Sequence, residues 1–179
     1  MIDSRLVRHG YSRVMADEPD FSGPGPWTLP VQGFVVETLD FSLPFEMAAR
    51  DPASSRQFKV QLGLPFVFAD QAGRQRDVVI DGVWVLDDVR AETIFYFGPD
   101  EDEDFPPARL APLRALEGDV IDYATVWPTS ALHVEMWSGR SITSGSDFAP
   151  EAWEVTGHGF HLVGVDRGPV IYTGEAWER

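Results

Sequence analysis

Residues 132–144 read LHVEMWSGRSITS and carry the plainest β signal in the chain. Apolar Leu132, Val134 and Met136 alternate with polar side chains, which is the period-two pattern of a half-buried strand. The Ser138-Gly139 pair that follows is typical of a two-residue hairpin turn. We therefore predict two antiparallel strands here, with residues 140–144 returning beside the first.

Similar short segments lie on both sides of this hairpin. Strands are predicted at 33–41, 58–62, 65–70, 78–80, 83–86, 92–97, 119–127, 152–156, 160–165 and 169–173. In the first of these, alternation puts Val35 with Leu39 on one face and Phe34 with Val36 on the other. One short helical segment is predicted near 107–116, limited to one or two turns by Pro112.

About ten to twelve strands with so little helix predict a mainly β fold, built as an antiparallel sandwich or barrel. An internal similarity organises the strands: residues 29–36 resemble 113–121 when Gly33 is laid on Gly118. Each copy continues as a long strand, a turn and an alternating strand. We therefore predict that the fold consists of two related β-meander halves.

The predicted boundaries follow from composition. Residues 1–26 end in a stretch rich in Pro, Gly and acidic side chains, which predicts a mobile N-terminal tail. Residues 27–179 are predicted to form a single β-rich domain. Within it, the halves are 27–98 and 113–174, joined by an acidic loop at 99–107.

The layout also resembles that of an actinobacterial β-rich domain family of unknown activity. The resemblance covers about residues 27–173 and lies in a Leu-x-Gly-x-Val strand pair, a central acidic loop, and a closing Glu-Ala-Trp-Glu motif at 151–154. It implies two related β-rich halves that end in a Gly-rich turn and a final strand. The chain departs from the family at 61–64, where Gln-Leu-Gly-Leu stands in place of an Arg-Ile-Glu segment. The resemblance implies no activity.

Composition excludes several kinds of chemistry. The 179 residues include no cysteine, so disulfides, thiolate metal sites and cysteine nucleophiles are impossible. No leader-like segment opens the sequence, and no apolar run approaches the roughly 20 residues that span a bilayer. We therefore expect a cytoplasmic protein that does not bind membranes.

The charge is strongly negative and widely distributed. The formal net charge is −15, of which −1 falls in residues 1–30, −4 in 31–98, −4 in 99–118 and −6 in 119–179. Such a chain repels the phosphate backbone, so direct binding of nucleic acid is not expected. A negative surface instead favours a basic protein partner. The alternative is that the charge serves only to keep the protein soluble.

The histidines suggest no metal site. His158 and His161 are three residues apart, a spacing that points them to opposite faces of a strand. His133 lies in the alternating strand and is expected to be a cross-strand polar residue. Nucleophile-elbow, phosphate-loop and EF-hand patterns are all missing. We predict no catalytic residues, no metal and no cofactor, although these absences do not decide whether the protein is an enzyme.

The tryptophans divide into two groups. Trp84, Trp127 and Trp153 lie inside strand patterns and are expected in the core, whereas Trp137 and Trp177 are expected to be exposed. Exposed tryptophan beside acidic residues suits a protein interface. The predicted partner-binding residues are Asp100, Glu101, Asp102, Glu103, Asp104, Trp137, Asp147, Glu151 and Trp177.

The function that the sequence favours is a non-enzymatic, acidic protein-binding module. It would act as an immunity-type inhibitor that covers a basic toxin or nuclease surface. Two alternatives remain open at this point. One is a small-ligand-binding or hydrolytic β-barrel with His133 or His161 and a carboxylate in its cavity. The other is an inhibitor that mimics nucleic acid.

Overall fold

The computed structural model describes residues 19–70, 78–80, 83–85, 93–97, 107–145, 153–165 and 168–173. These residues form fourteen strands and one helix. The elements are β1 (Trp27–Thr28), β2 (Val35–Asp40), β3 (Phe45–Arg50), β4 (Gln57–Leu62), β5 (Phe66–Asp70), β6 (Val78–Ile80), β7 (Val83–Val85), β8 (Thr93–Phe97), η1 (Pro107–Leu116), β9 (Ile121–Val126), β10 (Leu132–Met136), β11 (Ser141–Ser144), β12 (Trp153–Gly157), β13 (Phe160–Val163) and β14 (Val170–Thr173). The prediction of a mainly β fold is confirmed. The described part of the chain has no helix long and apolar enough to cross a bilayer.

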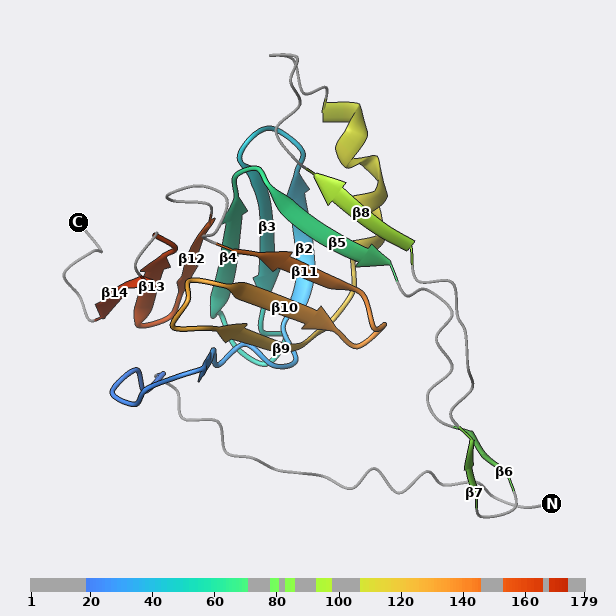
Figure 1. Cartoon of the computed structure of the whole chain (residues 1–179), viewed down its shortest axis with the longest axis horizontal. Coiled ribbons are helices and arrows are strands. Elements are labelled where there is room, and N and C mark those ends of the chain that lie inside the picture. The colour runs from blue at the N-terminus through green and yellow to red at the C-terminus, as the bar shows by residue number, and fades with distance from the viewer. Residues whose placement is uncertain are drawn as a thin grey trace.

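Two six-stranded antiparallel sheets form the body of the molecule (Figure 1). Sheet A has the order β1-β9-β10-β11-β5-β8, and sheet B has the order β2-β3-β4-β12-β13-β14. The strands of sheet A cross in front of those of sheet B in Figure 1, which gives a two-layered, sandwich-like arrangement. Among the described residues, strands β6 and β7 pair only with each other, antiparallel, as the two strands of a hairpin do. The turn of that hairpin lies outside the described residues.

The two predicted halves repeat one strand order in opposite sheets. In the first half, β2, β3 and β4 form a meander in sheet B, and β5 with β8 forms a pair in sheet A. In the second half, β9, β10 and β11 form the meander in sheet A, and β12 with β13 forms the pair in sheet B. Each sheet therefore combines the meander of one half with the strand pair of the other.

The halves meet at the two segments that the sequence similarity aligns. Val35 bridges Val120, and the backbone bonds around this bridge come in matching pairs. Gly33 N donates to Ile121 O at 2.8 Å while Gly118 N donates to Val36 O at 2.9 Å. Likewise Val36 N donates to Asp119 O and Ile121 N donates to Phe34 O, at 2.9 and 2.8 Å. An approximate two-fold axis thus passes through the bridge and exchanges the halves.

Matching β-bulges follow in both halves and correct one expectation. The register between β2 and β3 skips Glu37, and the register between β9 and β10 skips Asp122. A bulge adds one residue to one strand and so shifts the alternation of its side chains. The predicted faces of 33–41 are therefore wrong: Phe34 and Val36 are buried before the bulge, whereas Leu39 packs against the core after it.

Sequence analysis does not predict β3, although β3 is a central strand. Its residues, FEMAAR, include Ala, Glu and Met, which have little preference for strands. Burial alternates nevertheless, because Phe45, Met47 and Ala49 point into the core. The pairing of β3 with β2 and β4 on both sides overrides local propensity here.

The predicted helical segment is a 3₁₀ helix of ten residues, longer than the one or two turns expected. Leu110, Leu113 and Leu116 are fully buried. A 3₁₀ helix has three residues per turn, so residues spaced by three lie on one face. Pro112 further disfavours an α-helix, in which its ring would clash with the carbonyl four residues earlier. The leucine spacing therefore fixes both the geometry of η1 and its packing against the core.

Trp153 is buried, as predicted, and its hydrogen bond also links the two sheets. Its Nε1 donates to Ser130 O at 2.8 Å, and Ser130 Oγ donates to Val165 O at 2.6 Å. The Trp153 ring lies where a Cβ on Gly164 would stand, 2.4 Å away. The β9–β10 turn of sheet A is thus attached to sheet B. The core prediction for Trp127 is wrong, because β9 ends at Val126 and Trp127 is 46% exposed in that turn.

Two glycines at the two-fold axis should be equally sensitive to substitution. Gly33 and Gly118 have φ of +86° and +78°, with nothing near the position of an added Cβ. We expect Gly33→Ala and Gly118→Ala each to lower the free energy of unfolding by about 1 kcal/mol or more, since an L side chain is strained at positive φ. Urea denaturation measures the loss. Gly23→Ala is the control, because Gly23 lacks a positive φ, and a similar loss there would contradict this account.

Removing the Trp153 donor should weaken the attachment between the sheets. Trp153→Phe leaves the buried Ser130 carbonyl without this partner, so we expect a loss of about 1–3 kcal/mol in unfolding free energy. Trp127→Phe, at an exposed position, should change it by at most about 0.5 kcal/mol. Thermal and urea unfolding of both variants test the difference, and equal losses would refute the proposed role of Trp153.

Candidate functional site

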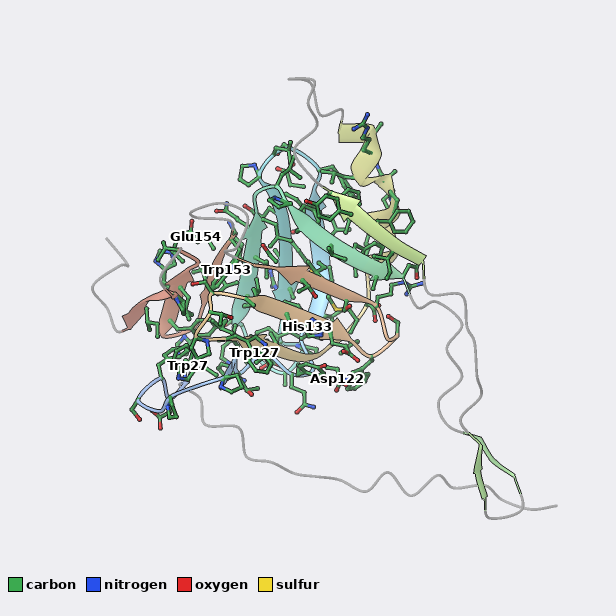
Figure 2. All side chains as sticks on the ribbon, viewed as in Figure 1. Trp27, Asp122, Trp127, His133, Trp153 and Glu154 are labelled. Atoms are coloured by element: carbon green, nitrogen blue, oxygen red, sulfur yellow. The ribbon has the colours of Figure 1, made fainter. Side chains whose placement is uncertain are left out.

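The outer face of sheet A presents polar, aromatic and aliphatic side chains in two rows across five strands. Strand register places the first row at Thr125, His133, Thr143, Val67 and Tyr96 and the second at Tyr123, Glu135, Ser141, Ala69 and Ile94. Their neighbours on the same strands, such as Val134 and Phe68, point into the core. Figure 2 shows His133 near the middle of this face.

A hydrogen-bonded cluster occupies the β9–β10–β11 part of the face. Tyr123 Oη donates to Glu135 Oε2 at 2.7 Å, and His133 Nε2 lies 3.3 Å from the same oxygen. His133 Nδ1 lies 2.9 Å from Thr143 Oγ1. His133 is thus a cross-strand polar residue, as predicted, and these contacts hold four side chains in place on an open surface.

The cluster changes the acidity of its phenol. The hydrogen bond to Glu135, partial burial and the negative charges of Glu135 and Asp122 together raise the pKa of Tyr123 to about 12. Each of these factors disfavours the phenolate. Tyr123 therefore remains a hydrogen-bond donor at all pH values at which proteins usually act.

Large exposed apolar side chains gather on sheet A and at its strand ends. On β8, Ile94 is 61% and Tyr96 59% exposed, and on β9 Tyr123 is 38% exposed. Trp127 and Trp137, which directly follow β9 and β10, are each 46% exposed. The remaining member of this group among the described residues, Leu43, lies in the β2–β3 turn. Ile94 and Tyr96 share strand β8, whereas Tyr123 lies four strands away on β9. Large exposed apolar side chains are candidates for contacts with a partner.

The outer face of sheet B provides an internal comparison. The two-fold relation pairs Ile94 with His161, Tyr96 with Val163 and Val67 with Glu154. Charged contacts cover sheet B: Lys59 Nζ lies 3.1 Å from Glu46, and His161 Nε2 lies 2.6 Å from Glu154. Two of these three equivalent positions therefore carry a histidine or a carboxylate on sheet B and an aliphatic side chain on sheet A, whereas Tyr96 and Val163 are apolar or aromatic on both faces.

Trp137 lies in the β10–β11 turn, which the ion pairs of Arg140 stabilise. Met136 N donates to Arg140 O, and Gly139 has a φ of +89°, so the turn has three residues, where sequence analysis predicts two. Arg140 Nε lies 3.1 Å from Asp70 and Nη1 lies 3.5 Å from Asp119. Ser138 Oγ also donates to Asp119.

Of the predicted partner-binding residues, the structure describes Trp137, which is exposed as expected. The other eight, Asp100, Glu101, Asp102, Glu103, Asp104, Asp147, Glu151 and Trp177, lie outside the described residues. So do the side chain of Trp84 and residues 1–18 of the tail predicted over 1–26.

Sequence analysis misses Ile94, Tyr96 and Tyr123 as surface residues. One signal was present in β8: the residues after Thr93 are all apolar or aromatic, so some must face solvent. No local sequence pattern predicts the cluster around His133, because its members come from three strands and meet only through the strand register.

The histidines form no interior site in the part of the chain that is described. His133 and His161 lie on opposite outer faces, and the buried core there contains neither histidine nor carboxylate. His158 is exposed in the β12–β13 turn. Nowhere in the described ranges do three or more His, Asp or Glu side chains gather as a metal site would need.

Comparison with protein-family models, curated proteins and solved structures gives no match for this chain. The resemblance to the actinobacterial family therefore remains an expectation. Functional inference depends on the chemistry of the surface alone.

The raised pKa of Tyr123 can be measured directly. Ultraviolet titration of phenolate should reveal a tyrosine that ionises at about pH 12, and Tyr123→Phe should remove that phase. The pKa of Tyr123 in the folded state exceeds its unfolded value of about 10. The stabilisation that protonated Tyr123 provides is therefore complete below about pH 10 and is lost as the pH rises towards 12.

Glu135→Gln should move this ionisation towards the ordinary value, since it removes the charge and weakens the hydrogen bond. Glu154→Gln, on the face of sheet B, should leave it unchanged. A high-pH phase that persists in the Glu135 variant would contradict the assignment.

Proposed function

We propose that this chain is a protein-binding module that uses the outer face of sheet A to bind a basic protein. The observation that carries the proposal is the chemical difference between two structurally equivalent faces. Sheet B bears the Lys59–Glu46 and His161–Glu154 pairs, whereas sheet A bears exposed Ile94, Tyr96 and Tyr123 beside its single His133–Glu135 pair among the described residues. Aromatic side chains are enriched in protein interfaces.

Charge supports the basic character of the partner. The described residues include six Lys and Arg side chains, and at least four of these are paired with carboxylates: Arg50, Arg56, Lys59 and Arg140. The whole chain retains a net charge of −15. Opposite charge accelerates the association of protein partners and disfavours wrong ones. An inhibitor that covers a basic toxin or nuclease surface is one form that this function would take.

Affinity capture with paired variants tests the proposal. Immobilised wild-type chain should retain a basic protein from extract at low salt. Trp137→Ala should weaken its binding by about tenfold or more, because truncating an aromatic anchor costs about 2 kcal/mol. His161→Ala, on the face of sheet B, should leave binding within about twofold.

Salt dependence provides a second measurement. Affinity for the retained protein should fall as ionic strength rises, since screening shortens the reach of charge to about 8 Å at physiological salt. Retention of no basic protein, or equal weakening by Trp137→Ala and His161→Ala, would refute the proposal.

A further inference from the structure

The two equivalent β-bulges each carry a carboxylate, but the structure pairs only one of them with a cation. At the bulge of sheet B, Glu37 Oε2 lies 3.1 Å from Arg50 Nε. Its equivalent in sheet A, Asp122, is partly exposed and has no hydrogen bond or ion pair within the part of the chain that the structure describes. Building on the proposed function, we propose that an arginine side chain of the basic partner binds beside Asp122, in the place that Arg50 takes beside Glu37.

Strand register shows why sheet A lacks a cation of its own at this place. Arg50 lies opposite Val35 in the pairing of β2 with β3, and the two-fold relation exchanges Val35 with Val120. The residue that meets Val120 is Trp137, whose backbone N–H donates to Val120 O at 2.8 Å. Trp137 therefore stands at the position of Arg50, and an indole replaces the guanidinium group beside the bulge.

The second cation of the sheet B face is replaced in the same way. Lys59 lies opposite Ala48, and the register equates these two residues with Ser141 and Glu135. Sheet A thus has a hydroxyl where sheet B has an ammonium group, and a carboxylate where sheet B has a methyl group. The five equivalent positions are Glu37, Glu46, Ala48, Arg50 and Lys59 on sheet B and Asp122, His133, Glu135, Trp137 and Ser141 on sheet A. Two acids face two bases on sheet B, whereas two acids and no Lys or Arg lie on sheet A.

The arginine that precedes β11 does not balance this charge. Arg140 Nε lies 3.1 Å from Asp70 Oδ1, and its Nη1 lies 3.5 Å from Asp119 Oδ2. Both contacts are with carboxylates other than Asp122 and Glu135. A cation that pairs with Asp122 must therefore come from outside the described residues, and a basic partner supplies such cations.

The side chains around Asp122 suit a guanidinium group in particular. After the hydrogen bond to Glu135 and burial, the charge of Asp122 also raises the pKa of Tyr123, so this carboxylate lies close to the phenol. Glu135 accepts the Tyr123 hydrogen bond through Oε2, and its Oε1 has no partner among the described residues. Arginine stacks on exposed aromatic rings such as that of Tyr123 while its N–H groups pair with carboxylates. The ammonium group of lysine lacks this planar geometry.

Titration of the isotope-labelled full chain with a short peptide of alternating Arg and Gly tests this inference. The amide signals of Asp122, Tyr123 and Glu135 should shift on binding, and those of β13 on sheet B should not. Replacing each Arg with citrulline, which has a similar shape and no charge, should weaken binding by about fivefold or more. The corresponding Lys-Gly peptide should bind about twofold or more weakly than the Arg-Gly peptide.

Matched variants separate a local contact from the general attraction of charge. Asp122→Asn should weaken binding of the Arg-Gly peptide by about fivefold, because it removes the charge that faces the guanidinium group. Glu37→Gln removes one charge from the equivalent bulge of sheet B and should change binding by less than about twofold. Unchanged β13 amide signals in both free variants show that the fold is retained.

Equal effects of the two variants, shifts confined to residues other than those around Asp122, binding of the citrulline or lysine peptide as tight as that of the arginine peptide, or no binding would each overturn the arginine site. The proposed function would then still be judged by whether Trp137→Ala weakens capture of a basic protein. The two inferences thus fail by different measurements.

Discussion

The pairing of residues 33–36 with 118–121 is the constraint on which the rest of the structure depends. Four backbone hydrogen bonds join these segments in two equivalent pairs about the Val35–Val120 bridge. The bridge directs the first strand of each half into a different sheet, and the bulges at Glu37 and Asp122 turn both strands in the same manner. Strand order, the aromatic core and the two outer faces all follow from that starting geometry.

Much of the fold can be predicted from particular residues. Alternation identifies β10 and β11, the leucine-rich segment identifies η1, and the alignment of Gly33 with Gly118 identifies the related halves. Local sequence patterns cannot predict features that depend on how the strands pair in the folded sheets. Strand β3 forms because β2 and β4 flank it, and the faces of β2 depend on a bulge. The His133 cluster likewise exists only through the register of three strands.

The same distinction applies to the candidate site. Charge predicts the kind of partner, and Trp137 is recognisable as a surface aromatic from its place beside a turn. Every second side chain of β8 points into the core, and the sequence does not show which set does so. In the structure Phe95 and Phe97 point inward, which leaves Ile94 and Tyr96 facing solvent. The comparison between sheets then marks Ile94 and Tyr96 as candidates for binding, because the equivalent strand pair of sheet B carries the polar His161–Glu154 pair.

The exchange of strands between the halves also has a consequence for folding. Strand β5 pairs with β11 and β12 pairs with β4, so neither half contains a complete sheet of its own. A half alone would leave a two-stranded hairpin unsupported, and such hairpins are marginally stable in water. The repeat visible in the sequence is therefore not a folding unit. We therefore expect both halves to fold in one cooperative transition, which the many long-range strand pairs should make slow.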